Sequence, residues 1–433
     1  MEATPNGAPH LYVRQIDRKE TKTLKRLLIV ALHICVGILV AAESDPAGNV
    51  FHLGEVKGRD CLIDPNGKPF VSLGINHVQA LKDMGQPDVF SDMFDRDWEK
   101  ACAAVHTNLT NWGFNTAGYG SPEPLCRMMP YMAPVYLTKN ANYLPDKQFY
   151  YPDVFCPKVQ ESMKKKLRYL VRTNKDNPNL IGYYWTDTPQ WNLKRARAKR
   201  GTDWVSTIRK MPLNAPGKKR YEQYVADCQQ KNVPAEDYGF LRLIARELYT
   251  VIGRETRRLA PNTLMFGERY LVGDHPDCVI EEALPFIDVL SIQPGGATFD
   301  EPYFDQLHAK FKKPILLCDH QCSFATPEYP KTMWQQLESE EAVGRAYGQY
   351  LRDAFAKPYI IGYHRCQYID RFAAHPAVLK QGIIRQDGSP YKTLSQYVSK
   401  ANAEVENWFK EKTASDEAEQ SPAGDVLKAA PED

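Results

Sequence analysis

The segment that decides the predicted fold is Asn179-Leu-Ile-Gly-Tyr-Tyr-Trp-Thr-Asp-Thr-Pro-Gln-Trp191. It is an apolar, aromatic run of strand character that ends in the carboxylate of Asp187. A second run of the same kind, Lys313-Pro-Ile-Leu-Leu-Cys-Asp-His320, stops at Asp319. Acids at the C-terminal ends of buried parallel strands are typical of catalytic barrels, which carry their active site at that face.

Eight strand-like runs alternate mostly with helical patterns along the chain. Parallel strands need helical crossovers, and the repeated unit closes naturally at eight. The sequence therefore predicts an α/β fold, a (β/α)8 TIM barrel. A doubly wound open sheet is the alternative, but no glycine-rich phosphate loop follows the first strand. The expected strands are 70–78, 114–118, 131–137, 180–185, 263–267, 287–293, 315–318 and 359–364.

The chain is expected to consist of an N-terminal segment (1–42), the barrel (43–410) and a disordered tail (411–433). Basic residues precede the apolar run 27–40, and small residues follow it up to Ala42, which is the layout of a secretory signal. The run is short for a membrane span. We therefore expect export, with an uncleaved anchor or a mis-set start codon as alternatives because the polar leader is long.

Composition excludes several classes of function. With 433 residues, 43% of them hydrophobic, the chain can bury a large core. A formal net charge of +2 argues against nucleic-acid binding driven by counterion release. The ten cysteines are scattered, and only Cys318 and Cys322 lie close together, with too few neighbouring ligands for a zinc site. The sequence thus predicts neither a metal nor a cofactor, and one or two disulfides stay possible in an exported protein.

Two strand-end carboxyl groups are the minimal set for cleaving a glycosidic bond. One carboxyl protonates the leaving oxygen and the other acts as nucleophile or as base for water. We assign the second role to Asp319 and the acid role to Asp187. Strand-end aspartates also cap helices or pair with arginine, which is the alternative for both. Glu268, at the end of the fifth strand, is a further candidate acid, with an ion pair to Arg269 as its alternative.

Polar and aromatic side chains at the expected strand ends complete the proposed cleft. Amides and imidazoles hydrogen-bond sugar hydroxyls or orient a carboxylate, and aromatic rings stack on sugars. Core or rim positions are the alternative for each of them. The basic stretch 193–220 is interpreted as an insertion that shapes the cleft, or else as a solvated loop. The candidate substrate-binding residues are Asn76, His77, Asn115, Trp185, Trp191, His320, His364 and Gln367.

Six short motifs also carry a family resemblance: Phe70-Val-Ser-Leu-Gly-Ile-Asn76, Trp112-Gly-Phe-Asn-Thr116, Ile181-Gly-Tyr-Tyr184, Asp288-Val-Leu-Ser291, Lys313-Pro-Ile-Leu-Leu317 and Gly362-Tyr-His-Arg-Cys-Gln-Tyr-Ile-Asp370. In this order and spacing they resemble the family 50 glycoside hydrolases, the β-agarases, within the clan of barrel glycosidases. The resemblance covers roughly 70–370. It implies an acid on the fourth strand, a nucleophile on the seventh, and a polysaccharide substrate such as a galactan.

The chain departs from that family at both catalytic positions. The family's fourth strand ends in Asn-Glu, and Asp187 stands here at the Asn and Thr188 at the acidic Glu. Asp319 stands at the nucleophilic Glu, with a side chain shorter by roughly 1.5 Å. Retention or inversion therefore stays open. The sequence predicts an exported, agarase-like glycoside hydrolase, and the alternative is a catalytically inactive barrel that binds carbohydrate.

Overall fold

The computed structural model describes residues 50–83, 88–138, 151–327, 329–332, 335–370 and 380–414. They belong to one unit, which spans 49–433. The expected signal segment, 1–42, lies outside the described residues, as does the tail from 415 onward. Within the described part, no helix is both long and apolar enough to cross a membrane.

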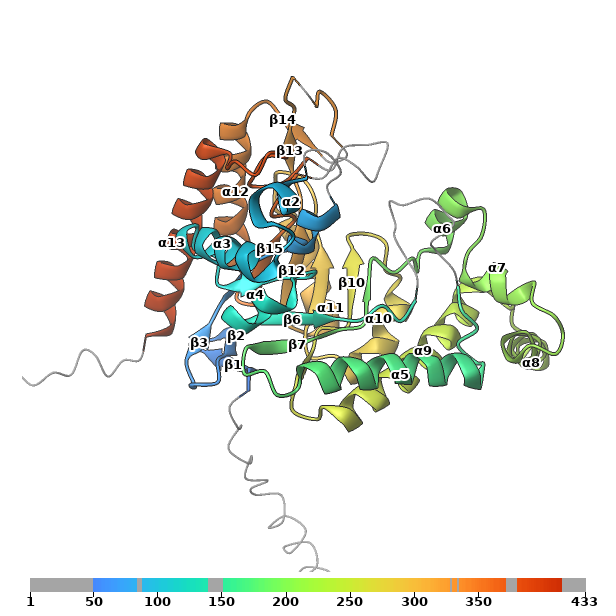
Figure 1. Ribbon diagram of the computed structural model, residues 1–433. Coiled ribbons are helices and arrows are strands. Elements are labelled where there is room, and N and C mark those ends of the chain that lie inside the picture. Colours follow the sequence, from blue (N-terminus) through green and yellow to red (C-terminus); the bar gives the residue numbers. More distant parts are fainter. Residues whose placement is uncertain are drawn as a thin grey trace, which may run out of the picture. The chain divides into compact units, whose positions relative to one another are not determined.

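The centre of the unit is a curled, ten-stranded sheet with the order β8-β10-β11-β12-β15-β4-β5-β6-β7-β9 (Figure 1). Neighbouring strands pair in parallel throughout, as between β12 and β15. The predicted α/β architecture with a parallel sheet is therefore confirmed, and each predicted strand overlaps an observed one. The strands are β4 (Ser72–Ile75), β5 (Thr116–Ala117), β6 (Tyr131–Pro134), β7 (Leu180–Tyr184), β8 (Thr186–Asp187), β9 (Leu264–Met265), β10 (Glu268–Leu271), β11 (Leu290–Gln293), β12 (Ile315–His320) and β15 (Ile360–Arg365).

The first predicted strand, 70–78, is divided in the structure. Its start belongs to β3 (Pro69–Phe70), which pairs antiparallel with β2 (Arg59–Ile63), itself paired with β1 (His52–Val56). The following residues form β4 of the large sheet. Leu62 of this small sheet, together with Phe51 just before β1, joins an apolar cluster with residues of the large sheet such as Leu316.

Both faces of the large sheet are buried, as expected for parallel strands. One face contributes to the small cluster with Leu62, and the other packs against the helices in the main core. Amphipathic spacing explains the helices. In α3, for example, apolar residues recur on one face, and the Asp97 carboxylate accepts from two backbone N–H groups of the first turn. The main helices are α3 (Trp98–Asn111), α4 (Glu123–Met128), α5 (Pro157–Asn174), α9 (Asp237–Leu259), α10 (Asp277–Ala283), α11 (Glu301–Phe311), α12 (Glu340–Phe355) and α13 (Lys392–Thr413).

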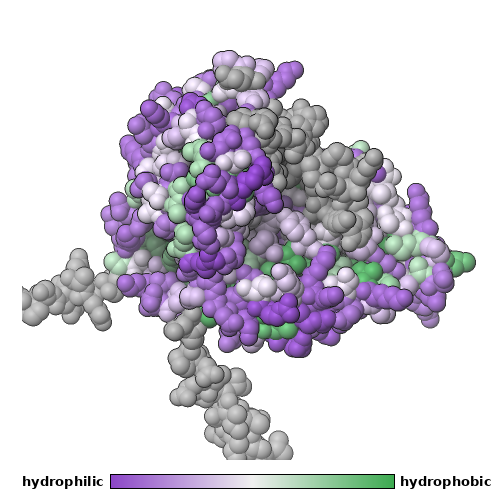
Figure 2. Space-filling view, in the orientation of Figure 1, coloured by the Kyte–Doolittle hydropathy of each residue, from purple (hydrophilic) through white to green (hydrophobic). Residues whose placement is uncertain are grey.

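The basic insertion after the fourth strand is helical rather than a loop. It forms α6 (Leu193–Arg200), α7 (Trp204–Arg209) and the start of α8 (Pro216–Gln230). These helices lie together beside the sheet (Figure 1), and they precede α9 in the chain. Figure 2 shows that the surface in this view is mainly hydrophilic, with hydrophobic residues confined to separate small patches. The insertion is therefore a packed part of the unit.

Candidate active site

Asp187 and Asp319 meet at the guanidinium of Arg269. Arg269 donates from Nη1 to Oδ1 of Asp187 at 2.8 Å, and its Nη2 lies 3.3 Å from Oδ2 of Asp319. Nη2 also donates to the backbone oxygen of Cys318 at 2.8 Å. Asp187 and Asp319 are 8% and 4% exposed, and Arg269 is 0% exposed. The structure thus brings the two predicted catalytic aspartates together, with a cation between them.

Strand register explains why these groups meet. Arg269 on β10 is the direct partner of Asp187 on β8, so both side chains leave the sheet on the same side. The guanidinium carbon of Arg269 lies over the Tyr119 ring, 3.8 Å from its centroid, and over the Tyr184 ring, 5.6 Å from its centroid. Cation–π contact and burial therefore fix the arginine where it reaches both carboxylates.

The environment displaces the two carboxyl pKa values in opposite directions. Burial raises the pKa of Asp187, and this effect outweighs the charge of Arg269. Burial also acts to raise the pKa of Asp319, but Arg269, followed by His77 and Asn76, outweighs it and holds that pKa well below its usual range. At neutral pH Asp319 is therefore ionised. Asp187 has the higher pKa of the two and keeps its proton to a higher pH.

Asn76 and His77, two of the candidate substrate-binding residues, lie beside Asp319. Asn76 donates from Nδ2 to Oδ1 of Asp319 at 2.6 Å, and its Oδ1 accepts from the Tyr119 backbone N–H at 2.8 Å. Nε2 of His77 is 3.7 Å from Oδ2 of Asp319. These contacts come from the end of β4 and orient the Asp319 carboxylate.

Glu268 points away from this group. Its Oε2 accepts from Nε1 of Trp191 and from the hydroxyl of Tyr249, both at 2.6 Å. Burial raises the pKa of Glu268 to about 7. The ion pair considered between Glu268 and Arg269 is wrong for the described structure, because Arg269 pairs with Asp187 and Asp319 on the opposite side of the strand.

The two tryptophans expected to stack on sugars are core residues. Trp185 and Trp191 are both 0% exposed. Trp185 donates from Nε1 to Oγ1 of Thr256 on α9 at 3.1 Å. The Trp191 ring stacks on Trp204 of α7, with centroids 4.3 Å apart. Trp191 thus fixes the helical insertion to the sheet, and in this structure neither ring offers a face to a ligand.

Two of the predicted binding histidines, His320 and His364, are also buried. Nε2 of His364 lies 2.8 Å from the Ser72 hydroxyl, and burial lowers its pKa to about 3. His320 has both ring nitrogens hydrogen-bonded, to the Tyr363 hydroxyl at 2.6 Å and to a backbone oxygen at 2.7 Å. The His320 ring stacks on Tyr350 of α12, with centroids 3.9 Å apart, so it lies between the sheet and that helix rather than beside the Asp319 carboxylate.

Asn115 and Gln367 are less directly related to the carboxylates. The Asn115 side chain bonds to the backbone of the segment around β4, accepting from Leu73 N–H and donating to the Val71 oxygen, each at 2.9 Å. Gln367 is 1% exposed, and its backbone N–H donates to the Gln381 oxygen at 3.2 Å. Asn115 therefore supports the strands and does not face the site.

Two site residues were missing from the sequence interpretation. Gln293, the last residue of β11, donates from Nε2 to Oδ1 of Asp187 at 2.8 Å. Tyr119 supplies the ring under Arg269. The signal for Gln293 was present, because it ends the strand Ile287-Asp-Val-Leu-Ser-Ile-Gln293 just as the aspartates end theirs. No local pattern marks Tyr119.

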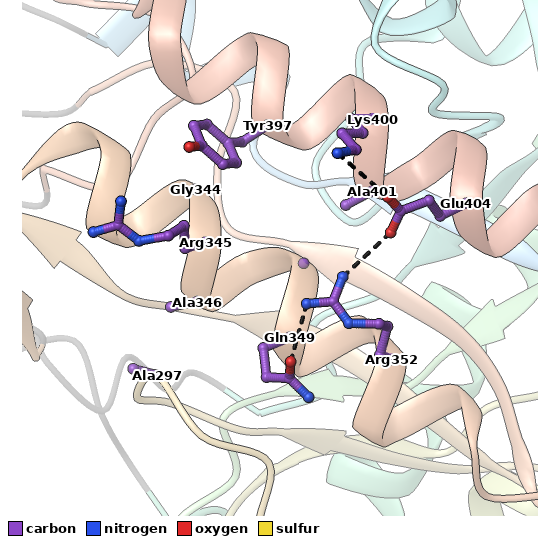
Figure 3. Close-up of a pocket in the computed structure, with 11 residues that line it drawn as sticks. Ala297, Gly344, Arg345, Ala346, Gln349, Arg352, Tyr397, Lys400, Ala401 and Glu404 are labelled. Carbon is purple, nitrogen blue, oxygen red and sulfur yellow. Dashed lines mark hydrogen bonds and ion pairs between the residues drawn. The ribbon is translucent and has the colours of Figure 1, made fainter.

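Two cavities among the described residues lie elsewhere, along the seam between α12 and α13. The larger has a volume of about 510 Å³ (Figure 3). On its rim, Glu404 pairs with Arg352 at 3.2 Å and with Lys400 at 4.0 Å, so the carboxylate offsets one of the two positive charges. The smaller cavity, of about 370 Å³, reaches Trp408. Neither cavity includes a residue predicted for the site.

No protein-family model matches the chain, and no curated protein matches it. Solved structures do. An exo-β-agarase superposes with a TM-score of 0.71 at 14% identity, over 85% of this chain and 66% of its own. The agarase AgWH50C gives 0.66 at 15% identity, over 83% and 65% of the two chains. A GH2 β-galacturonidase from Eisenbergiella tayi gives 0.51 at 13%, over 82% and 54%.

The chain has a glycoside hydrolase-like fold. It spans less than two thirds of the length of each of the three structures named above. At 13–15% sequence identity, the similarity to these structures shows a shared fold. The chemistry must therefore be argued from the residues that this chain places at its strand ends.

Proposed function

We propose that the protein is an agarase-like glycoside hydrolase that uses Asp319 as nucleophile or base and Asp187 as acid. The observation that carries this proposal is that two strand-end carboxylates meet at one buried guanidinium, with Arg269 2.8 Å from Asp187 and 3.3 Å from Asp319, in surroundings that displace their pKa values in opposite directions. In glycosidases, paired carboxyls take different roles when their environments separate their pKa values. The ionised Asp319 suits attack or activation of water. Asp187, with its raised pKa, suits donation of a proton to the leaving oxygen.

We further propose that the sheet is a closed (β/α)8 barrel. Only Trp185 separates β7 from β8, and Phe266 and Gly267 separate β9 from β10. The Trp185 N–H donates to the Gly267 oxygen at 2.8 Å, between the β7–β9 and β8–β10 pairs. In this interpretation β7 with β8 is the fourth barrel strand and β9 with β10 is the fifth. Asp187, Arg269 and Asp319 then stand at the C-terminal rim, where barrel enzymes hold their catalytic groups.

The proposed substrate is a polysaccharide or oligosaccharide, with a galactan as the first choice. The solved structures with the same fold include agarases and a β-galacturonidase, and these names indicate galactose-derived substrates for those proteins. Export of the protein, proposed from the N-terminal sequence, would bring it to such a polymer. Asn76 and His77 lie beside Asp319 and are the proposed sugar-contacting groups, together with Gln293 beside Asp187.

A specific observation favours a second function, carbohydrate binding without hydrolysis. Arg269 engages both carboxylates, and Thr188 stands where the related family has its acid. A guanidinium that holds both acids opposes the transfer of a proton from Asp187. The two functions differ in whether any glycosidic bond is cleaved.

The test measures reducing ends released from agarose and a panel of algal and plant polysaccharides, together with phenol release from activated aryl glycosides. We expect Asp319→Asn to lose at least about a thousandfold on both substrate types, because the transition state loses several kcal/mol of stabilisation. Asp187→Ala should lose polysaccharide hydrolysis but keep much of the aryl glycoside activity, since an acidic phenol leaves without protonation.

Glu268→Gln is the matched control, because this carboxyl is buried but faces away from Arg269. It should keep the ratio of the two activities. Parallel losses on both substrates for Asp187→Ala would remove Asp187 as the acid. A folded wild type that cleaves nothing, binds agarose in affinity electrophoresis and gains hydrolysis with Thr188→Glu would establish the second function instead.

A further inference from the structure

Asp319 has two further neighbours of a different chemical kind. His77, Asp319 and Cys366 each offer one atom, and these atoms all lie within 4.8 Å of one another in a buried place. The residues follow or end β4, β12 and β15, so three strands bring them together. We propose that this triad binds Zn²⁺ through Nε2 of His77, a carboxylate oxygen of Asp319 and Sγ of Cys366, with the fourth position open.

The spacing of the triad suits ligands of one ion better than hydrogen-bond partners. Nε2 of His77 lies 3.7 Å from Oδ2 of Asp319, which is too long for a hydrogen bond. Tetrahedral zinc with bonds of about 2.1 Å to nitrogen and oxygen and about 2.3 Å to sulfur holds its ligand atoms roughly 3.4–3.7 Å apart. The His77–Asp319 pair therefore already has a suitable separation, and the pairs with Sγ of Cys366, which lie within 4.8 Å, need a contraction of at most about an ångström.

Neighbouring amides already support two of the proposed ligands. Gln381 donates from Nε2 to Sγ of Cys366 at 3.0 Å, a contact that suits an electron-rich sulfur. Asn76 donates to Oδ1 of Asp319 at 2.6 Å, which leaves Oδ2 on the side of His77. Outer contacts of this kind orient metal ligands and tune their affinity. The triad thus has the second layer of contacts that zinc sites use.

Charge balance also favours a divalent cation. In the zinc-bound state both carboxylates are taken as ionised, so Arg269, Asp187 and Asp319 together carry one net negative charge. Burial raises the pKa of the Cys366 thiol well above its usual value, so the thiol loses its proton only when the metal binds, and the thiolate then adds a second negative charge. One Zn²⁺ would neutralise this buried group, which lowers the cost of burying it. The nearby guanidinium is therefore compatible with the metal.

The donor set selects among metals. Thiolate and imidazole suit zinc, whereas magnesium and calcium prefer oxygen ligands. Three protein ligands with one open position are the arrangement of catalytic rather than structural zinc sites. Asp319 is also the proposed nucleophile, so zinc-loaded and hydrolytically active protein would be separate states. Zinc binding can be measured directly and does not depend on whether the protein cleaves sugars.

The test uses the full chain, stripped with a chelator and reloaded with Zn²⁺ or with Co²⁺ as a spectroscopic probe. We expect one tightly held equivalent of zinc after gel filtration, and a thiolate-to-cobalt charge-transfer band in the near ultraviolet. Cys366→Ser should lose that band, and His77→Ala should lower affinity at least tenfold. Gln381→Leu should weaken binding by about 10–100-fold while keeping the band, since its contact is with a ligand.

Cys228→Ser is the matched control, because Cys228 lies in α8, away from the triad, and its loss removes one buried thiol. It should bind and absorb like the wild type. Circular dichroism melts establish that each variant is folded. The proposal is overturned if folded wild type retains no zinc, or if Cys366→Ser shows the same cobalt spectrum as the wild type.

Discussion

Arg269→Met is the perturbation for which the structure gives the clearest expected magnitude. The side chain is 0% exposed and donates at 2.8 Å to Asp187 and at 2.8 Å to the Cys318 oxygen, with Asp319 at 3.3 Å. Methionine keeps much of the volume but leaves two buried carboxylates without their cation. Removing one partner of a buried ion pair costs about 3–5 kcal/mol, so we expect a loss near the upper end at pH 7.

The loss should depend on pH in a defined direction. In the wild type, folding lowers the pKa of Asp319, so its stabilisation is present above the unfolded pKa and is lost as pH falls through the folded value. Without Arg269, burial raises the pKa of both aspartates, so their penalty exists above the folded pKa and is relieved as pH falls. The difference between the wild type and Arg269→Met should therefore shrink from pH 7 towards pH 4.

Urea unfolding followed by tryptophan fluorescence measures this difference. Adding Asp187→Asn and Asp319→Asn to Arg269→Met should recover most of the loss, because no charge is then left unpaired. Arg258→Met is the surface control, since Arg258 is 62% exposed and pairs with Glu255, and it should cost less than about 1 kcal/mol. A loss below about 1 kcal/mol for Arg269→Met, or an equal loss at pH 4 and pH 7, would refute the reasoning.

Two further predictions concern the Glu268 cluster and the N-terminus. Folding raises the pKa of Glu268 to about 7, so wild-type stability should fall by about 3 kcal/mol as pH rises from the unfolded pKa through 7. Glu268→Gln should remove this dependence, measured by urea midpoints at several pH values, and parallel profiles for the two proteins would contradict it. Export should yield a mature protein that begins near Glu43 in N-terminal sequencing, and an intact Met1 on intracellular protein would contradict it.

The strands and the two aspartates were accessible from the sequence because both signals are local. Parallel strands buried on both faces have continuous apolar sequences, so an acidic residue at the end of such a run is easily recognised. Asp187 and Asp319 could therefore be paired from the order of residues alone. The helical insertion was less accessible. Its basic composition left open an insertion that shapes the cleft or a solvated loop, whereas in the structure Trp204 packs it against Trp191.

The sequence by itself determined where the strands of the large sheet lie, that they run in parallel and that two of them end in acids. Only the tertiary structure decided which groups touch those acids. Arg269 and Glu268 are neighbours in the chain, yet alternation along a strand sends one to Asp187 and Asp319 and the other to Trp191 and Tyr249. His77, Asp319 and Cys366 lie far apart in sequence and meet because parallel strands bring their C-terminal ends to one edge. Local sequence spacing does not predict such contacts between distant residues, because strand register and sheet curvature determine them.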